Sequence, residues 1–303
     1  MGKEQFLAYL KAHYPEQYLL DEPMSRHTTF RVGGPADIFV MPRSATQVQE
    51  LIVQTKEAGL PLTVVGNGSN LLVRDKGIRG VVLQLGNAFK QLIHKDTHII
   101  AETGISLSAL SNQAAEWGLA GLEFACGIPG TLGGAVVMNA GAYGGEIGPL
   151  VLSVEAVTLD GKLLELSNED LDFAYRHTTL QDINVIVLQV ELALTPGNKD
   201  DIHSRMAELT QKRITKQPLN LPSAGSTFKR PTGYYAAALI DQAGLRGYRV
   251  GDAQVSEKHT GFVVNLGNAT SSEILQLMED VRNKVHEFSG VWLEPEVRIL
   301  GEK

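Results

Sequence analysis

Two glycine-rich segments are the strongest indication of chemistry in this sequence of 303 residues. The first, Gly-Asn-Gly-Ser-Asn at residues 66–70, directly follows an apolar run that is typical of a strand. Glycines at such a position allow a tight turn and let backbone N–H groups face phosphate oxygens. The Rossmann fingerprint needs a further glycine at position 71, which is Leu. The segment is therefore a dinucleotide-binding turn on another scaffold, or an ordinary hairpin.

The second glycine-rich segment, residues 127–145, contains no charged side chain. A flexible linker would be polar, whereas an apolar glycine-rich segment indicates backbone that packs closely against an extended ligand. Tight packing of a helix on a strand is the alternative. No Gly-Lys-Ser or Gly-Lys-Thr sequence follows, which excludes a P-loop for nucleotide hydrolysis.

Helices and strands must position these segments, and hydrophobic periodicity predicts both. Four helices are expected, at residues 46–58, 106–117, 200–213 and 274–288. Strands are expected at 37–41, 62–65, 80–85, 97–102, 153–159, 162–166, 185–194, 259–264 and 293–300, and residues 71–74 have the same character. Helices mixed with hairpins predict an α+β fold, not a regular βαβ array.

A turn cluster at residues 195–200, Thr-Pro-Gly-Asn-Lys-Asp, marks the expected domain boundary. We expect an N-terminal helix within residues 1–19, a cofactor domain at 20–196 and a second domain at 197–303. The cofactor domain divides further into subdomains at about 20–86 and 87–196.

Composition excludes several classes of protein. The chain is 43% hydrophobic and 20% charged, as in ordinary globular proteins. A net charge of −7 argues against a nucleic-acid binder, although it permits an anionic small ligand. Cys126 is the only cysteine and the eight histidines form no metal-binding motif, so we expect neither a disulfide nor a metal. No signal peptide and no apolar run of membrane length are present, which predicts a cytoplasmic protein without membrane insertion.

Several separated motifs, in order, resemble one enzyme family. They are Thr28–Asp37, Gly66–Asn70, Gly121-Leu-Glu-Phe-Ala-Cys-Gly-Ile-Pro-Gly-Thr-Leu-Gly-Gly134, Pro222-Ser-Ala-Gly-Ser-Thr-Phe-Lys-Arg230, Ala253-Gln-Val-Ser-Glu-Lys-His259 and Leu293-Glu-Pro-Glu-Val-Arg298. Nearly the whole chain resembles the UDP-N-acetylenolpyruvoylglucosamine reductases of bacterial peptidoglycan synthesis, especially their shorter type II branch. The resemblance implies non-covalent FAD in a domain of the vanillyl-alcohol-oxidase (PCMH) type, NADPH as reductant, and UDP-N-acetylglucosamine-enolpyruvate as substrate.

The resemblance and the two glycine-rich segments together predict the cofactor contacts. They are Gly66, Asn67, Gly68, Ser69, Asn70, Gly127, Ile128, Pro129, Gly130, Gly133, Gly134, Asn139 and Gly141.

Three residues are expected to carry the chemistry. The family motif places the proton donor at Ser226, which would otherwise be an ordinary turn hydroxyl. Arg176 can bind a carboxylate through two parallel hydrogen bonds, although without the motif it would be a surface arginine. Glu296 matches the family's active-site glutamate. Glu294 would share its face of an extended segment, so the motif alone selects Glu296.

Basic residues are expected to bind the UDP diphosphate. Arg213 and Lys216 lie at the end of a predicted helix, where cations also stabilise the helix dipole. Lys229 and Arg230 follow the Ser226 motif.

Two other functions compete with this prediction. Another FAD-dependent oxidoreductase on the same cofactor domain would usually have a longer second domain and a residue for covalent flavin attachment. A non-catalytic nucleotide-sugar binding protein would be expected to lack Ser226, Arg176 or Glu296. We expect a monomer without nucleic-acid partners.

Overall fold

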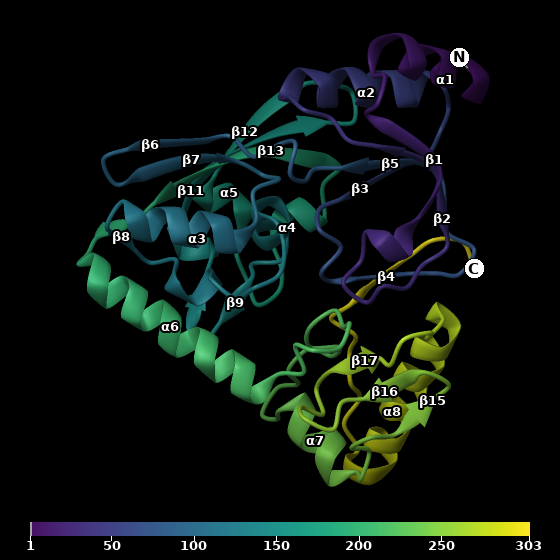
Figure 1. The fold of residues 1–303 in the computed structure, drawn as a ribbon, viewed down its shortest axis with the longest axis vertical. Coiled ribbons are helices and arrows are strands. Elements are labelled where there is room, and N and C mark those ends of the chain that lie inside the picture. The colour runs from purple at the N-terminus through teal and green to yellow at the C-terminus, as the bar shows by residue number, and fades with distance from the viewer. Residues whose placement is uncertain (1) are drawn as a thin grey trace. The chain divides into compact units, whose positions relative to one another are not determined.

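The computed structural model describes residues 2–303, which form two compact units (Figure 1). The first unit comprises the residues up to Leu19, Phe39–Asn67 and Gly80–Arg213. The second comprises Leu20–Ile38, Gly68–Arg79 and Ile214–Lys303. Each unit is therefore built from segments that are distant in the sequence.

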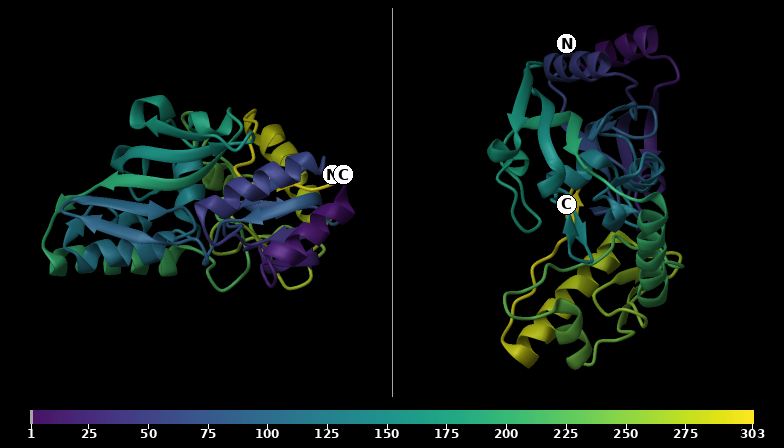
Figure 2. Two further views of the ribbon diagram at one scale, coloured as in Figure 1. Left: turned by 90° about the horizontal axis from the view of Figure 1, so that it is seen from above. Right: turned by 90° about the vertical axis from the view of Figure 1, so that its left-hand side faces the viewer.

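A five-stranded antiparallel sheet is the centre of the first unit, in the order β12-β11-β13-β7-β6 (Figures 1 and 2). Its strands are β6 (Leu92–Lys95), β7 (His98–Glu102), β11 (Val151–Thr158), β12 (Leu163–Ser167) and β13 (Val185–Ala193). Val154 of β11 and Val190 of β13 each lie between two polar residues and are buried, and Ile99 of β7 is buried with them. The alternation gives the sheet one apolar face, and α3 (Leu107–Glu116) and α4 (Leu132–Val137) contribute to the same core.

A second sheet has the order β1-β2-β5-β3. Its strands are β1 (Tyr18–Pro23), β2 (Pro35–Val40), β3 (Leu62–Val65) and β5 (Ile78–Gln84). β3 and β5 are parallel, and α2 (Ala45–Glu57) precedes β3. The Ser44 hydroxyl accepts the N–H of Gln47 and so caps α2, while Val48, Leu51 and Ile52 bury one face of the helix.

The first unit also contains several short helices and strands. They are α1 (Lys3–His13), β8 (Leu119–Ala120), β9 (Gly141–Ala142), β10 (Gly145–Glu146), α5 (Asn168–Leu171) and β14 (Thr195–Pro196). α6 (Lys199–Lys216) buries Ile202 and Met206 against Ala115 of α3, which keeps most of this long helix in the first unit.

The second unit is organised around α8 (Ser271–Ser289), which packs on a small antiparallel sheet (Figures 1 and 2). The sheet consists of β15 (Arg249–Val250), β16 (Ala253–Val255) and β17 (Val263–Asn265), and α7 (Ala236–Gln242) lies beside α8. β4 (Leu71–Val73) pairs in parallel with β18 (Arg298–Leu300). Ile274, Leu277 and Val281 occur at helical spacing and form the buried stripe of α8.

An aspartate from a distant loop completes the N-terminus of α8. The Asp75 carboxylate accepts the N–H groups of Ser271 and Ser272 at 2.8 and 3.0 Å, and also the Ser272 hydroxyl. Burial alone would raise the pKa of Asp75, but these hydrogen bonds outweigh it and lower the pKa from its ordinary value.

The predicted elements agree with this structure in most places. All four expected helices are present, and the α+β class is confirmed. The strand expected at 259–264 is wrong in its first half, because the Ser256 hydroxyl accepts the N–H groups of Lys258 and His259 and bends the chain there. The strand expected at 293–300 is confined to its last three residues. The elements β1, β6, β16, α4, α5 and α7 were not predicted, nor were the two-residue strands β8, β9, β10, β14 and β15.

The compact units divide the chain differently from the predicted domain bounds. The division falls at Arg213 in α6 and not at residue 196, because most of α6 packs on the first unit. Residues 20–38 and 68–79 belong with the C-terminal part, because Phe30 and Val32 are part of its hydrophobic core and β4 pairs with β18. The boundaries of the functional domains stay a prediction.

Candidate active site

The first glycine-rich segment forms a turn directly after β3. Gly68 has φ +62°, and a Cβ atom there would lie 2.0 Å from the carbonyl oxygen of His27. Only glycine fits such a position without displacing backbone. Within residues 2–303, the backbone N–H groups of Gly66–Asn70 donate to no protein acceptor. The turn therefore presents a run of free N–H donors.

The second glycine-rich segment contains the short helix α4, which the sequence analysis did not predict. The Thr131 hydroxyl accepts the N–H of Gly134 at 3.4 Å and caps the helix. Gly133 packs against Thr103, since a Cβ on Gly133 would lie 2.8 Å from the Cβ of Thr103. Close helix packing, the alternative interpretation of this segment, thus holds for Gly133.

The two glycine-rich segments meet in the first unit. A Cβ atom on Gly66 would lie only 2.4 Å from the Thr131 hydroxyl oxygen. In the described part of the chain, the N–H groups of Gly130 and Thr131 also donate to no protein acceptor. Free donors of the second segment therefore lie beside the start of the first.

Arg176 lies in a tight turn against the second glycine-rich segment. Ala174 and His177 exchange two backbone hydrogen bonds around it. Arg176 has φ +57°, which costs an L-residue about 1–2 kcal/mol. Its guanidinium donates to the carbonyl oxygens of Asn139 at 3.4 Å and Gly141 at 3.2 Å. The structure thus places Arg176 beside two residues predicted to contact the cofactor.

The Asn139 side chain, which we expected to contact the cofactor, is bound within the protein. It is only 2% exposed. Its Oδ1 accepts the N–H of Gly148 at 3.1 Å, and its Nδ2 donates to the carbonyl of Ala174 at 2.9 Å. Through these hydrogen bonds, the Asn139 amide connects the Arg176 turn to the backbone at Gly148.

Ser226 and Glu296 lie on neighbouring extended segments of the second unit. Ser226 follows Gly225, which has φ +76°, and its side chain is exposed. The N–H of Glu296 donates to the carbonyl of Thr227 at 2.8 Å, so Glu296 lies opposite the residue next to Ser226. Asn70 of the first glycine-rich segment donates from its side chain to the carbonyl of Glu296 at 3.1 Å. The fold thus brings the predicted proton donor, the predicted glutamate and one end of the glycine turn into one unit.

The same pairing separates Glu296 from Glu294. The carbonyl of Glu294 accepts the N–H of Lys229 at 2.8 Å, and its exposed carboxylate lies 3.5 Å from the Lys229 ammonium. Glu294 is thus two residues further from Ser226 along the pairing than Glu296, which agrees with the choice of Glu296.

The four predicted diphosphate ligands are distributed over both units. Arg213 lies beside the second glycine-rich segment, since a Cβ on Gly127 would lie 2.9 Å from its Cδ. Burial lowers the pKa of Arg213 from its ordinary value. Lys216, Lys229 and Arg230 belong to the second unit, where the Arg230 guanidinium lies 4.1 Å from the centre of the Tyr235 ring.

Thr131 and Gln181 contact predicted site residues but were not themselves predicted. A threonine directly before a helix is a common cap, and this could have indicated Thr131. Nothing in the local sequence indicated Gln181, whose side chain donates to the carbonyls of Val137 and Arg176.

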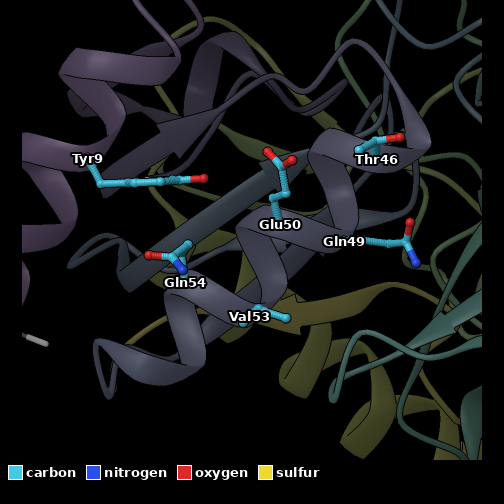
Figure 3. Close-up of a pocket in the computed structure, with 6 residues that line it drawn as sticks. All are labelled: Tyr9, Thr46, Gln49, Glu50, Val53 and Gln54. Carbon is cyan, nitrogen blue, oxygen red and sulfur yellow. The ribbon is translucent and has the colours of Figure 1, made fainter.

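A surface groove of about 330 Å³ beside α2 contains none of the predicted site residues. Figure 3 shows Tyr9 of α1 opposite Glu50 and Gln54 of α2. The Tyr14 hydroxyl donates to Glu50, and burial together with this bond raises the pKa of Tyr14. The groove is thus formed where α1 and α2 pack together.

Residues 2–303 contain neither a metal-binding cluster nor a membrane-spanning helix. No cluster of three or more His, Cys, Asp or Glu side chains could hold a metal ion there. None of the helices in this range is both long and apolar enough to span a membrane.

Comparisons with known proteins agree with this geometry. Residues 36–167 match the FAD binding domain family, and residues 217–300 match the family "UDP-N-acetylenolpyruvoylglucosamine reductase, C-terminal domain". The chain shares its fold with alkyldihydroxyacetonephosphate synthase, at a TM-score of 0.51 and 19% identity over 65% of this chain and 41% of that one. The fold is thus that of FAD-binding proteins of the PCMH type, followed by a second α+β domain.

Closer relatives identify the particular family. A UDP-N-acetylenolpyruvoylglucosamine reductase of Agathobacter rectalis is 50% identical over 99% of both chains, and one of Clostridioides difficile is 51% identical over 95% of this chain and 94% of that one. The crystal structure of the Thermus caldophilus reductase superimposes with a TM-score of 0.80 at 36% identity, covering 94% of this chain and 98% of that one. The chain belongs to the UDP-N-acetylenolpyruvoylglucosamine reductase family.

Proposed function

We propose that this chain reduces the enolpyruvyl ether of UDP-N-acetylglucosamine-enolpyruvate to UDP-N-acetylmuramate, a step of peptidoglycan precursor synthesis, with FAD as cofactor and NADPH as reductant. Family membership supports the overall reaction. The observation that carries the assignment of its residues is the pairing of the Ser226 and Glu296 segments, with Asn70 of the glycine turn bonded to Glu296.

The residues of the two glycine-rich segments fit FAD. A diphosphate needs hydrogen-bond donors that the protein itself does not use, and the N–H groups of Gly66–Asn70, Gly130 and Thr131 meet this requirement. Glycine at positions 66 and 68 lets the backbone take a path that a side chain would block. We propose that these donors bind the FAD diphosphate.

Held by these residues, FAD would supply the hydride chemistry that links NADPH to the terminal vinyl carbon of the substrate. The substrate carboxylate then gains enolate-like charge, which the Arg176 guanidinium stabilises through two parallel hydrogen bonds. Ser226 donates its hydroxyl proton to the neighbouring carbon. Glu296 is the second acid–base group beside Ser226, since its backbone pairs with Thr227 in the same unit.

Arg213, Lys216, Lys229 and Arg230 are proposed to bind the UDP diphosphate. Cations bind phosphate through charge-assisted hydrogen bonds. The burial of Arg213 beside Gly127 weakens competition from water.

The test is an anaerobic absorption experiment on the purified protein. Flavin absorbance should fall on addition of NADPH and return on addition of UDP-N-acetylglucosamine-enolpyruvate. Ser226→Ala should still be reduced by NADPH but should turn over the enolpyruvyl substrate about 10²- to 10⁴-fold more slowly, because general acid catalysis contributes about that much. Ser289→Ala, at the end of α8 in the same unit, is the matched control. Unchanged turnover in Ser226→Ala would exclude this serine as the proton donor.

We further propose that the protein is a cytoplasmic monomer with its cofactor domain at residues 20–196 and its substrate domain at 197–303. Its nucleotide-sugar and NADPH substrates support the location. Size-exclusion chromatography with light scattering tests the oligomeric state, and a mass of twice 32.8 kDa would exclude a monomer.

A further inference from the structure

The turn that carries Arg176 has a backbone conformation that needs support. Arg176 has φ +57°, a region that non-glycine residues seldom occupy. Ala174 and His177 close the turn with two hydrogen bonds between their own backbones. Such strain persists only where surrounding contacts hold it in place.

Two side-chain amides supply these contacts. Gln181 donates from Nε2 to the carbonyl of Arg176 at 3.1 Å and to the carbonyl of Val137, the last residue of α4, at 2.7 Å. Asn139, just after α4, donates from Nδ2 to the carbonyl of Ala174 at 2.9 Å. The two amides therefore bind the turn to the end of α4, one on each side of Tyr175.

The Arg176 guanidinium donates to two backbone carbonyls in this network. Its hydrogen bonds to the carbonyls of Asn139 and Gly141 are 3.4 and 3.2 Å long. A carboxylate is a stronger acceptor than a carbonyl for a guanidinium. A substrate carboxylate would thus be a stronger acceptor for these two donors than the carbonyls, while the amides hold the backbone of the turn unchanged.

We propose that Gln181 and Asn139 are positioning residues that hold the Arg176 turn in the geometry that reduction of the enolpyruvyl substrate requires. This inference rests on the proposed role of Arg176. We expect Gln181 not to be required for flavin reduction by NADPH, because its amide donates to Val137 and Arg176, neither of which is a predicted cofactor contact.

The test uses substitutions that keep shape and remove donors. Gln181→Glu and Asn139→Asp replace each amide nitrogen by oxygen, and aspartate tolerates the left-handed backbone of residue 139. Gln181→Met is a second variant of similar length without charge. Gln54→Glu, on α2 of the same unit, is the matched control.

Trypsin cleavage after Arg176, followed by mass spectrometry on the purified holoenzyme, reports the turn directly. We expect cleavage at this bond to become at least about tenfold faster in the three variants and to be unchanged in Gln54→Glu. Stopped-flow measurement should show reoxidation by the enolpyruvyl substrate slowed about 10- to 100-fold, as for a misplaced catalytic group. Reduction by NADPH should stay within about twofold in the two Gln181 variants.

The Arg176→Ala variant distinguishes the proposed role of Arg176 from the proposed positioning role of the two amides. If Arg176→Ala reoxidises at the normal rate, the proposed role of Arg176 fails. If Arg176→Ala is slow while Gln181→Glu and Gln181→Met reoxidise and resist trypsin like the unsubstituted protein, the positioning inference is overturned. Equal slowing of both half-reactions in these variants would indicate general damage and would overturn it as well.

Discussion

The contact between Gly66 and Thr131 joins the two glycine-rich segments, and Gly66→Ala tests it. The new Cβ would lie 2.4 Å from the Thr131 hydroxyl oxygen, which is 1.0 Å inside the 3.4 Å limit of ordinary contact. The φ of Gly66 lies outside the positive range, so the effect of the substitution is steric. Forcing a methyl group into a packed site costs about 1–3 kcal/mol of the free energy of unfolding.

A double-mutant cycle isolates this overlap from other effects. Thr131→Ala alone removes the cap of α4 and should cost about 1 kcal/mol. In the double variant the new methyl group occupies the space that the hydroxyl leaves, so the combined cost should be at least about 1 kcal/mol smaller than the sum of the single costs. Gly86→Ala is the control, because its Cβ would meet only ordinary contact at 3.5 Å.

Urea unfolding and flavin-fluorescence titration measure the two consequences. Gly66→Ala should lower the urea midpoint with an unchanged m-value and should weaken FAD binding, because displacement of the turn moves the N–H donors. Additive costs in the cycle, or a Gly66→Ala protein as stable as Gly86→Ala, would refute the contact and with it the adjacency of the two segments.

Two further predictions concern carboxylates of the second unit. Glu296→Gln should lower kcat for the enolpyruvyl substrate about 10²-fold or more, whereas Glu294→Gln, two residues away and exposed, should change kcat less than about threefold; steady-state kinetics on both variants checks this, and equal effects would contradict the assignment. Asp75→Ala should destabilise the protein by about 1–2 kcal/mol, because it removes the acceptor of two N–H groups in the first turn of α8, in addition to the Thr270 cap. Since the pKa of Asp75 is lower in the folded than in the unfolded state, this stabilisation is present above the unfolded pKa of about 3.9 and is lost as pH falls through the folded pKa. Unfolding measured between pH 2 and 7 should therefore show the difference between Asp75→Ala and the unsubstituted protein shrinking at the acid end, and a constant difference would contradict the role of Asp75.

Regular elements with a long apolar stripe were predictable from local sequence. The stripe of Ile274, Leu277 and Val281 predicts α8 because burial of one face is a property of consecutive turns. α4 was not predictable in this way, since its six residues begin with Leu-Gly-Gly and glycine disfavours helix. Its formation depends on Ile105 and Thr103, whose carbonyls accept the N–H groups of the first two residues of the helix.

The sequence by itself determined the α+β class, the positions of the main helices, the two glycine-rich segments and, through its motifs, the residues expected to act. All of these features depend on hydrophobic periodicity or on residue types that are close together in the chain. Only the tertiary structure decided that Gly66 meets Thr131, that Glu296 and not Glu294 lies beside Ser226, and that the Asn139 side chain supports the Arg176 turn. Each of these depends on hydrogen bonds or contacts between segments separated by about 35 to 70 residues. Such pairings follow from the packing of the whole core, which cannot be predicted from a local sequence pattern.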